Sequence, residues 1–380
     1  MNEISKIRVM LVDDSAIVRG LMQRALKADP EIEIVGTAVD GQMAIDTLKR
    51  TPTDVLVLDI EMPVKDGLTA LPELLQASPG LKVIMASTLT LRNAGISMRA
   101  MELGAMDYLA KPSAAKPDEV EVFYRELISK IKALSARRLR STLTPPVATA
   151  AATIPPSSAS MAPRPAMAPS GAGLVTPLAT AQEALMQVPR AQAIAIASST
   201  GGPQALLTLF AALKGRAIST PIFITQHMPP NFTTILAEHI TKTLGADCHE
   251  GVDGEEVKPG IVYLAPGDYH MIAERQGPAV RIRLNQNPPE NFCRPSADPM
   301  LRSLAAIYGN KLVAVVLTGM GSDGAPGAAD VVKAGGTVAA QNEATCVVYG
   351  MPRAVVEAKL ARAILPLDQM APYIAKAMGA

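Results

Sequence analysis

The chain has 380 residues, of which 48% are hydrophobic, and its 36 Lys and Arg nearly balance 35 Asp and Glu. This composition allows two or three folded domains, excludes wholesale disorder, and argues against a chain dominated by nucleic-acid binding. Three widely spaced cysteines, no apolar run near the roughly 20 residues of a membrane span, and no signal-peptide h-region predict a cytoplasmic protein without membrane insertion.

Residues 1–140 form the first predicted domain. Short apolar runs alternate there with segments of helical periodicity. Such strand–helix alternation is typical of a parallel sheet with helices on both faces. The last helical segment, residues 122–140, gathers Lys and Arg at its C-terminal end, where the helix dipole favours positive charge.

Residues 141–189 differ in composition from the segments on either side. Between Ser141 and Thr180 the only charged residue is Arg164, and most of the others are Ala, Pro, Ser and Thr. A segment of this kind cannot bury a core and predicts a flexible linker, with a typical span of roughly 35–40 Å.

Residues 190–380 resume the alternation and form the second predicted domain. We expect buried strands at 191–198, 220–226 and 311–319, and helices at 203–215, 231–245 and 298–309. Residues 261–285 predict a hairpin. The pattern indicates a doubly wound α/β domain with some antiparallel content.

Polar residues fall at the expected carboxyl ends of the first domain's strands, where open parallel sheets bind ligands. They are Asp13, Asp14, Asp59, Ser87, Thr88 and Lys111. Three carboxylates placed together repel one another unless a hard cation such as Mg²⁺ or Mn²⁺ lies among them, and a lysine and a hydroxyl would hold phosphoryl oxygens. Each aspartate taken alone could instead cap the helix that follows.

The acidic pair Asp13-Asp14, the stretch LDIEMPVKDGL around Asp59, Ser87, and YLAKP with Lys111 occur in a specific order. From residue 7 to about 135 the chain resembles the receiver domain of bacterial two-component response regulators. The resemblance implies a flavodoxin-like fold with a five-stranded parallel sheet. It also implies that Asp59 accepts a phosphoryl group from a histidine kinase.

The same resemblance implies a Mg²⁺ site. Asp14 and Asp59 would bind the ion, with Asp13 acting through water and Glu61 through its backbone carbonyl. Lys111 would hold the phosphoryl group, Ser87 stands where the family has its switch hydroxyl, and Tyr108 stands where it often has a rotating aromatic residue.

The stretch AIASSTGGPQ, residues 195–204, opens the second domain with three consecutive hydroxyls. Its apolar strand should end near Ser198, the two glycines allow a tight turn, and Pro203 suits the first turn of a helix. A hydroxyl here could cap the helix or act as a nucleophile. A phosphate-binding turn is disfavoured because neither GxGxxG nor GxxxxGK[ST] is present.

A nucleophile needs a base and an acid that orients the base. His227 follows the predicted strand 220–226, and Asp323 follows the strand 311–319, so both should lie at the same sheet edge as the serines. The loop Gly319-Met320-Gly321 could aim a backbone N–H at an oxyanion. The order Ser…His…Asp and the lack of a GxSxG elbow exclude an ordinary α/β-hydrolase.

Six motifs spread over residues 192–358 resemble the catalytic domain of bacterial chemotaxis protein-glutamate methylesterases: SSTGGP, TQHMPP, YLAPGDYHM, RPSADP, LTGMGSDGA and AQNEATCVVYGMPRA. The resemblance implies Ser199 as nucleophile, His227 as general base, Asp323 as its orienting acid and the Met320 N–H as an oxyanion donor. The family commonly has Gly-Ala before the serine, and here Ala197-Ser198 takes that place. Ser198 therefore remains a second candidate for the nucleophile.

The resemblance further implies a phosphorylation-activated hydrolase that resets receptor signalling in chemotaxis adaptation. It would demethylate glutamate γ-methyl esters on methyl-accepting chemotaxis receptors, and family members can also deamidate receptor glutamines. The unphosphorylated receiver would cover the active site, and the chemotaxis histidine kinase would be the phosphodonor. Mg²⁺ would serve only the receiver, ester hydrolysis would need no cofactor, and a monomer is expected.

Three alternatives differ in the role of the second domain. It could only bind a partner, it could hydrolyse a small ester, or it could regulate transcription. The presence of Ser199, His227 and Asp323 together disfavours the first. The third is disfavoured because no helix-turn-helix pattern is evident and residues 190–380 carry 16 Lys and Arg against 15 Asp and Glu.

Overall fold

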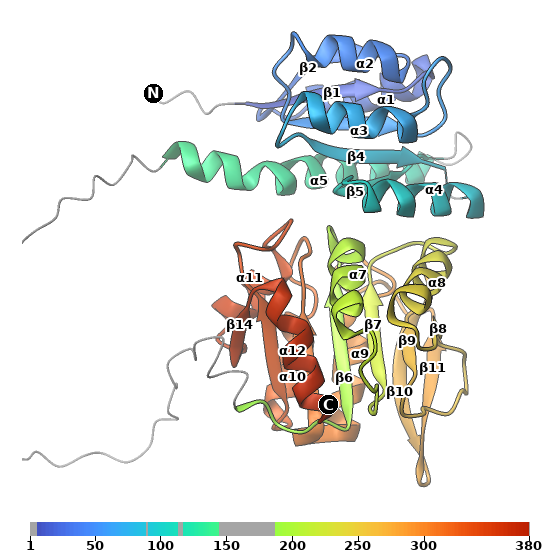
Figure 1. The fold of residues 1–380 in the computed structure, drawn as a ribbon, viewed down its shortest axis with the longest axis vertical. Coiled ribbons are helices and arrows are strands. Elements are labelled where there is room, and N and C mark those ends of the chain that lie inside the picture. The colour runs from blue at the N-terminus through green and yellow to red at the C-terminus, as the bar shows by residue number, and fades with distance from the viewer. Residues whose placement is uncertain (1–5, 89, 113–116, 144–186, 380) are drawn as a thin grey trace, which may run out of the picture.

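The computed structural model describes residues 6–88, 90–112, 117–143 and 187–379. Most of the predicted linker, residues 144–186, lies outside the described residues. The chain forms two α/β domains stacked on one another (Figure 1). Among the described helices, none is both long and apolar enough to cross a membrane.

The first domain contains a five-stranded parallel sheet of order β2-β1-β3-β4-β5. Its central strands are almost wholly buried because helices cover both faces, as the apolar runs predict. The strands are β1 (Ile7–Val12), β2 (Ile32–Ala38), β3 (Val55–Asp59), β4 (Lys82–Ser87) and β5 (Asp107–Ala110). The helices are α1 (Ala16–Lys27), α2 (Gly41–Leu48), α3 (Gly67–Ala77), α4 (Leu91–Glu102) and α5 (Pro117–Leu143).

The second domain contains a seven-stranded parallel sheet of order β14-β13-β12-β6-β7-β9-β8 and a separate antiparallel hairpin, β10-β11. The strands are β6 (Ala193–Ser198), β7 (Ile222–Gln226), β8 (Cys248–Glu250), β9 (Val262–Leu264), β10 (His270–Gln276), β11 (Ala279–Asn285), β12 (Leu312–Val316), β13 (Thr337–Gln341) and β14 (Ala363–Leu365). The helices are α7 (Gly202–Leu213), α8 (Phe232–Leu244), α9 (Ala297–Tyr308), α10 (Ala325–Lys333), α11 (Met351–Glu357) and α12 (Leu367–Met378).

The hairpin is shorter than the sequence pattern predicted. Residues 262–264 form β9 in the main sheet, and only the chain from His270 onward forms the hairpin. The turn between them packs tightly, because a Cβ on Gly267 would collide with the backbone of Pro229 and Pro230. The apolar run at 261–265 therefore belongs to the main sheet, and a tight turn separates it from the hairpin.

The turn from β6 into α7 depends on two glycines. Gly201 has a φ of 74°, which a residue with a side chain adopts only with strain. A Cβ on Gly202 would lie 2.9 Å from the Cβ of Ser198 and would collide with Gln226. These glycines let the chain turn sharply, so the short segment from Ser199 to Gly201 lies at the edge of the sheet, between β6 and α7.

The two domains meet through α4, β5 and α5, which lie on the side of the first domain that faces the second (Figure 1). Helix α4 packs against α7 and α8. The ring of Tyr108 stacks on the ring of Phe232, with their centroids 4.4 Å apart. The carboxyl end of β6 consequently lies near the interface between the domains.

Candidate phosphorylation and hydrolase sites

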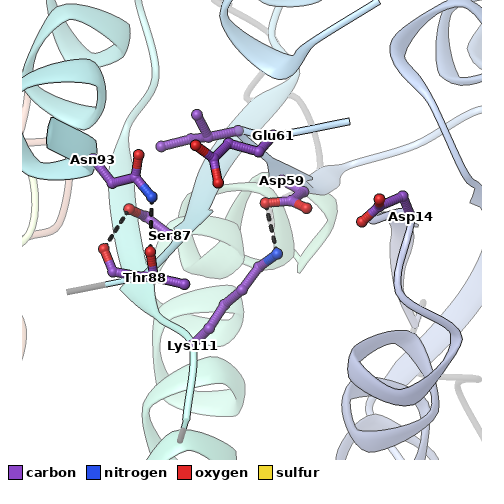
Figure 2. A pocket seen from close by; sticks show the side chains of 8 residues that line it. Asp14, Asp59, Glu61, Ser87, Thr88, Asn93 and Lys111 are labelled. Atoms are coloured by element: carbon purple, nitrogen blue, oxygen red, sulfur yellow. Dashed lines mark hydrogen bonds and ion pairs between the residues drawn. The ribbon is translucent and has the colours of Figure 1, made fainter. Parts of the chain in front are cut away.

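A pocket of about 290 Å³ lies at the carboxyl ends of β1, β3, β4 and β5 (Figure 2). Residues on four different strand ends and the loops after them therefore converge, as the sheet topology predicts. The pocket is lined by Asp14, Asp59, Ile60, Glu61, Ser87, Thr88, Asn93 and Lys111.

Three aspartates lie close together at this pocket, and the ammonium group of Lys111 contacts two of them. Carboxylate oxygens of Asp13, Asp14 and Asp59 all lie within 4.8 Å of one another. The Nζ of Lys111 lies 2.6 Å from Asp59 Oδ1 and 2.8 Å from Asp13 Oδ2. Burial raises the pKa of Asp59 to about 6, and the bond to Lys111 offsets only part of this effect. A set of clustered hard oxygen donors fits Mg²⁺.

These aspartates do not cap the helices that follow them. Ser15 caps α1 and Asp66 caps α3, each accepting a hydrogen bond from a backbone N–H in the first turn. The side chains of Asp14 and Asp59 instead face each other across the pocket (Figure 2). The capping alternative is therefore wrong for Asp13, Asp14 and Asp59.

Of the other residues predicted for this site, some line the pocket and one lies at the interface between the domains. Ser87 is buried at the end of β4, where its hydroxyl donates to the carbonyl of Thr88, and Asn93 Nδ2 donates to Thr88 Oγ1 at 2.7 Å (Figure 2). Glu61 also borders the pocket. Tyr108 does not line this pocket but lies at the domain interface against Phe232.

The three hydroxyls of AIASSTGGPQ have different surroundings. Ser198, the last residue of β6, is fully buried and donates to Gln226 Oε1 at 2.7 Å. The amide of Gln226 donates in turn to the backbone carbonyl of Ser199 at 3.0 Å. Thr200 Oγ1 donates across the domain interface to Asp107 Oδ2 at 2.8 Å. Among the described residues, only the Ser199 hydroxyl of these three has no recorded hydrogen bond.

The residues predicted to complete the site come from the ends of β7 and β12, the two strands that flank β6 in the sheet. His227 directly follows β7, and Asp323 precedes α10 in the loop after β12. His227 Nε2 lies 2.6 Å from Asp323 Oδ2. Burial favours the neutral ring, but the contacts with Asp323 and Cys293 outweigh it and raise the pKa of His227 above its ordinary value. The predicted base and orienting acid are thus hydrogen-bonded.

Asp323 is held by a dense set of donors. Its carboxylate accepts from the Ser296 hydroxyl at 2.7 Å, the Ala297 N–H at 2.6 Å and the Gly324 N–H at 2.9 Å. Burial would raise its pKa, but the bond with His227 and these donors hold the pKa of Asp323 well below its usual range. Asp323 is therefore an anion, with the positive N-terminal end of α9 directed at it.

The loop that joins β12 to α10 lies against Ser199. A Cβ on Gly319 would lie 2.9 Å from the Cβ of Ser199, so the loop backbone approaches the serine closely. Within the described ranges no hydrogen bond is recorded from the Met320 N–H. The expected role of the Met320 N–H as an oxyanion donor requires such a free N–H, and the role itself stays a prediction.

Sequence reasoning missed several side chains around Asp323. Asn291 Nδ2 donates to both Asp323 Oδ1 at 3.0 Å and Asp298 Oδ2 at 2.8 Å. Burial and the charge of Asp323 raise the pKa of Asp298 to about 6. Cys293 Sγ lies 3.4 Å from His227 Nδ1. These residues lie in or next to the motif RPSADP, which is the one sequence signal that could have indicated them.

The first domain contacts the turn that carries Ser199. Asp107, which accepts from Thr200, also pairs with Lys130 Nζ at 2.8 Å. In the first turn of α7, Gln204 donates to the backbone carbonyls of Met101 and Ala105. The residues on the C-terminal side of Ser199 are thus bonded to the first domain.

Comparison with known proteins matches both domains to described families. Residues 9–120 match the response regulator receiver domain, and residues 194–374 match the CheB methylesterase family. A protein-glutamate methylesterase/protein-glutamine glutaminase of Azospirillum brasilense is 50% identical over 378 residues, which cover 97% of this chain and 92% of the relative.

Two further relatives carry the same description. One from Paramagnetospirillum magneticum is 50% identical over 371 residues, covering 97% of this chain and 96% of the relative. One from Caulobacter vibrioides is 47% identical over 370 residues, covering 97% and 98%. With both domains matched and nearly the whole length shared, the chain belongs to the protein-glutamate methylesterase/protein-glutamine glutaminase family of response regulators.

Proposed function

We propose that this chain is a phosphorylation-activated protein-glutamate methylesterase that demethylates chemotaxis receptors and resets their signalling. The observation that carries the proposal is the 2.6 Å bond between His227 and Asp323 at the sheet edge where Ser199 lies. Receptor substrates and the histidine kinase phosphodonor follow from membership of the family. The enzyme would act as a cytoplasmic monomer.

Ser199 is the proposed nucleophile. Its Oγ attacks the carbonyl carbon of a glutamate γ-methyl ester while His227 takes the hydroxyl proton. His227 then gives that proton to the departing methoxide, which leaves as methanol. A water molecule, deprotonated by the same histidine, hydrolyses the acyl-enzyme and restores glutamate. The same steps with ammonia as the leaving group would deamidate a receptor glutamine.

The carboxylate of Asp323 determines which ring nitrogen does this work. An ionised carboxylate only accepts hydrogen bonds, so His227 Nε2 carries its proton toward Asp323. Nδ1 is left as the nitrogen that exchanges protons with Ser199. The oxyanion of the tetrahedral intermediate would accept from the Met320 N–H, because that donor has no recorded partner among the described residues.

Asp59 is the proposed phosphorylation site. Mg²⁺ held by Asp14 and Asp59, with Asp13 acting through water and the Glu61 carbonyl, would neutralise charge as the phosphoryl group arrives. Lys111 and Ser87 would bind the phosphoryl oxygens. Lys111 now bridges Asp13 and Asp59, so phosphorylation must redistribute its contacts.

The route from Asp59 to the catalytic domain runs through β5. Tyr108 on this strand stacks on Phe232, and Asp107 accepts from Thr200, next to Ser199. We propose that the unphosphorylated receiver covers the active site and that phosphorylation weakens these contacts. Ester hydrolysis itself would use only side chains and a backbone N–H of the catalytic domain, without a cofactor.

Methanol release from methylated receptor membranes tests the proposal, with and without acetyl phosphate and Mg²⁺. The phosphodonor should stimulate the wild type and leave Asp59→Asn at its basal rate. Asp40→Asn is the matched control, because Asp40 caps α2 outside the pocket and asparagine caps as well as aspartate does. Stimulation of Asp59→Asn equal to that of the wild type would contradict the phosphorylation site. Absence of methanol from the wild type in every condition would contradict the substrate class.

A further inference from the structure

Residues 291–293 form a short segment between the hairpin and α9 that contacts both the receiver and the active site. Asn291 and Phe292 have φ values of 52° and 62°, and for a bulky residue such as Phe292 this conformation is strained. Such strain persists only where the surrounding contacts hold it. The contacts of all three side chains therefore indicate what the segment does.

The outer end of the segment touches the receiver. Phe292 is 83% exposed, and the guanidinium carbon of Arg125, on α5, lies 5.0 Å from its ring centroid. An exposed phenylalanine in a strained conformation gains little from its own domain, and the cation–π contact gives it a partner in the other domain.

The inner end of the segment touches the catalytic groups. Asn291 Nδ2 donates to Asp323, and Cys293 Sγ lies 3.4 Å from His227 Nδ1. With a neutral ring, Nδ1 accepts the thiol proton; with a charged ring, Nδ1 donates to the sulfur. In both protonation states Cys293 occupies the nitrogen that Ser199 needs.

We propose that Cys293 is a positioning residue that holds His227 Nδ1 away from Ser199 while the receiver is docked, and that Arg125 keeps it there through Phe292. The inference rests on the proposed roles of Ser199 and His227. It explains why the Ser199 hydroxyl has no recorded hydrogen bond within the described residues. Withdrawal of α5 would release the segment and let Ser199 replace the thiol at Nδ1.

The inhibition proposed here is separate from a block of substrate entry. A receptor helix is large and would be excluded by the docked receiver in any case. A small reagent that enters the site would still react slowly while Nδ1 is occupied. Reactivity of Ser199 toward a small probe therefore distinguishes the two forms of inhibition.

The test is the rate at which a fluorophosphonate labels the full-length protein, with and without acetyl phosphate and Mg²⁺. In this reaction Ser199 Oγ bonds to phosphorus, fluoride leaves, and His227 takes the serine proton. Cys293→Ala should raise the unphosphorylated rate about five-fold, the factor that one hydrogen bond is worth, and lower the ratio of phosphorylated to unphosphorylated rates. Arg125→Ala and Phe292→Ala should change the rate in the same direction.

Two control variants separate this role from a structural one. Cys293→Ser keeps a polar hydrogen at the same position and should restore part of the restraint. Arg24→Ala, which removes an exposed arginine of α1, should leave both rates unchanged. An unphosphorylated rate of Cys293→Ala equal to or below the wild-type rate would overturn the inference. Equal labelling of the wild type and Ser199→Ala would instead contradict the proposed nucleophile.

Discussion

Replacement of Asp323 by asparagine removes one charge and keeps the shape of the side chain. In the wild type the carboxylate accepts from His227 Nε2 at 2.6 Å and from the backbone N–H of Ala297 at 2.6 Å. An asparagine that turns its NH₂ toward His227 makes Nε2 an acceptor and places the ring proton on Nδ1. Nδ1 then cannot accept the proton of Ser199.

The expected loss follows from this wrong tautomer. A change of this kind in a Ser-His-Asp triad lowers kcat on the order of 10⁴-fold, which corresponds to about 5.4 kcal/mol of activation free energy. The amide also faces N–H donors that the carboxylate satisfied, so the free energy of unfolding should fall by about 1–3 kcal/mol.

Methanol release from methylated receptor membranes in the presence of acetyl phosphate measures the loss, and thermal unfolding followed by circular dichroism shows that the variant is folded. Asp298→Asn is the matched control. Asp298 accepts from Gly324 and Gly327 and has no recorded bond to His227 among the described residues, so this variant should stay within about ten-fold of wild type. A folded Asp323→Asn enzyme within ten-fold of wild type would refute the role of Asp323.

Three further predictions concern residues around the two sites. Ser198→Ala leaves Gln226 Oε1 without its buried donor, so urea denaturation should show a loss of about 1–3 kcal/mol; an unchanged midpoint would contradict the bond. Gly319→Ala places a methyl group against Met351 and Ser199 and should lower kcat about 100-fold; full activity would show that the loop yields without cost. Because burial raises the pKa of Asp59 to about 6, its ionisation destabilises the folded receiver increasingly as pH rises from about 4 through about 6, by up to about 3 kcal/mol. Without Mg²⁺, the melting temperature of the wild type should therefore fall over this pH range relative to that of Asp59→Asn. Above pH 6, added Mg²⁺ should raise the melting temperature of the wild type and leave that of Asp59→Asn unchanged. Melting temperatures of the two proteins that change in parallel with pH would contradict this prediction.

The sequence predicted the fold because both domains follow simple patterns. The fully buried strands β3 and β6 appear as uninterrupted apolar runs, and the residues at their carboxyl ends are those predicted to form the two sites. The topology of a parallel sheet alone predicts that Asp13, Asp59 and Lys111 lie close together, because each stands at the carboxyl end of a strand. Only the run at 261–265 was misplaced, because an apolar run does not reveal which sheet it joins.

The contacts that the sequence could not predict join residues far apart in the chain. Ser198 is a second candidate for the nucleophile from the sequence alone, and its bond to Gln226, 28 residues away, favours Ser199. The sequence could predict Tyr108 as a switch residue, which stays a prediction, and could not predict that its ring stacks on Phe232 of the other domain. The contact between Cys293 and His227 depends on a strained loop that leaves no periodic signal.

Methanol release by Ser199→Ala and Ser198→Ala, each treated with acetyl phosphate and Mg²⁺, tests the central claim most directly. The two serines are adjacent, but one ends a buried strand and the other stands in the turn beside Gly319. Ser199→Ala should release no methanol above the blank, and Ser198→Ala should retain a reduced but measurable rate. Methanol release by Ser199→Ala together with its loss in Ser198→Ala would contradict the assignment of the nucleophile and the mechanism built on it.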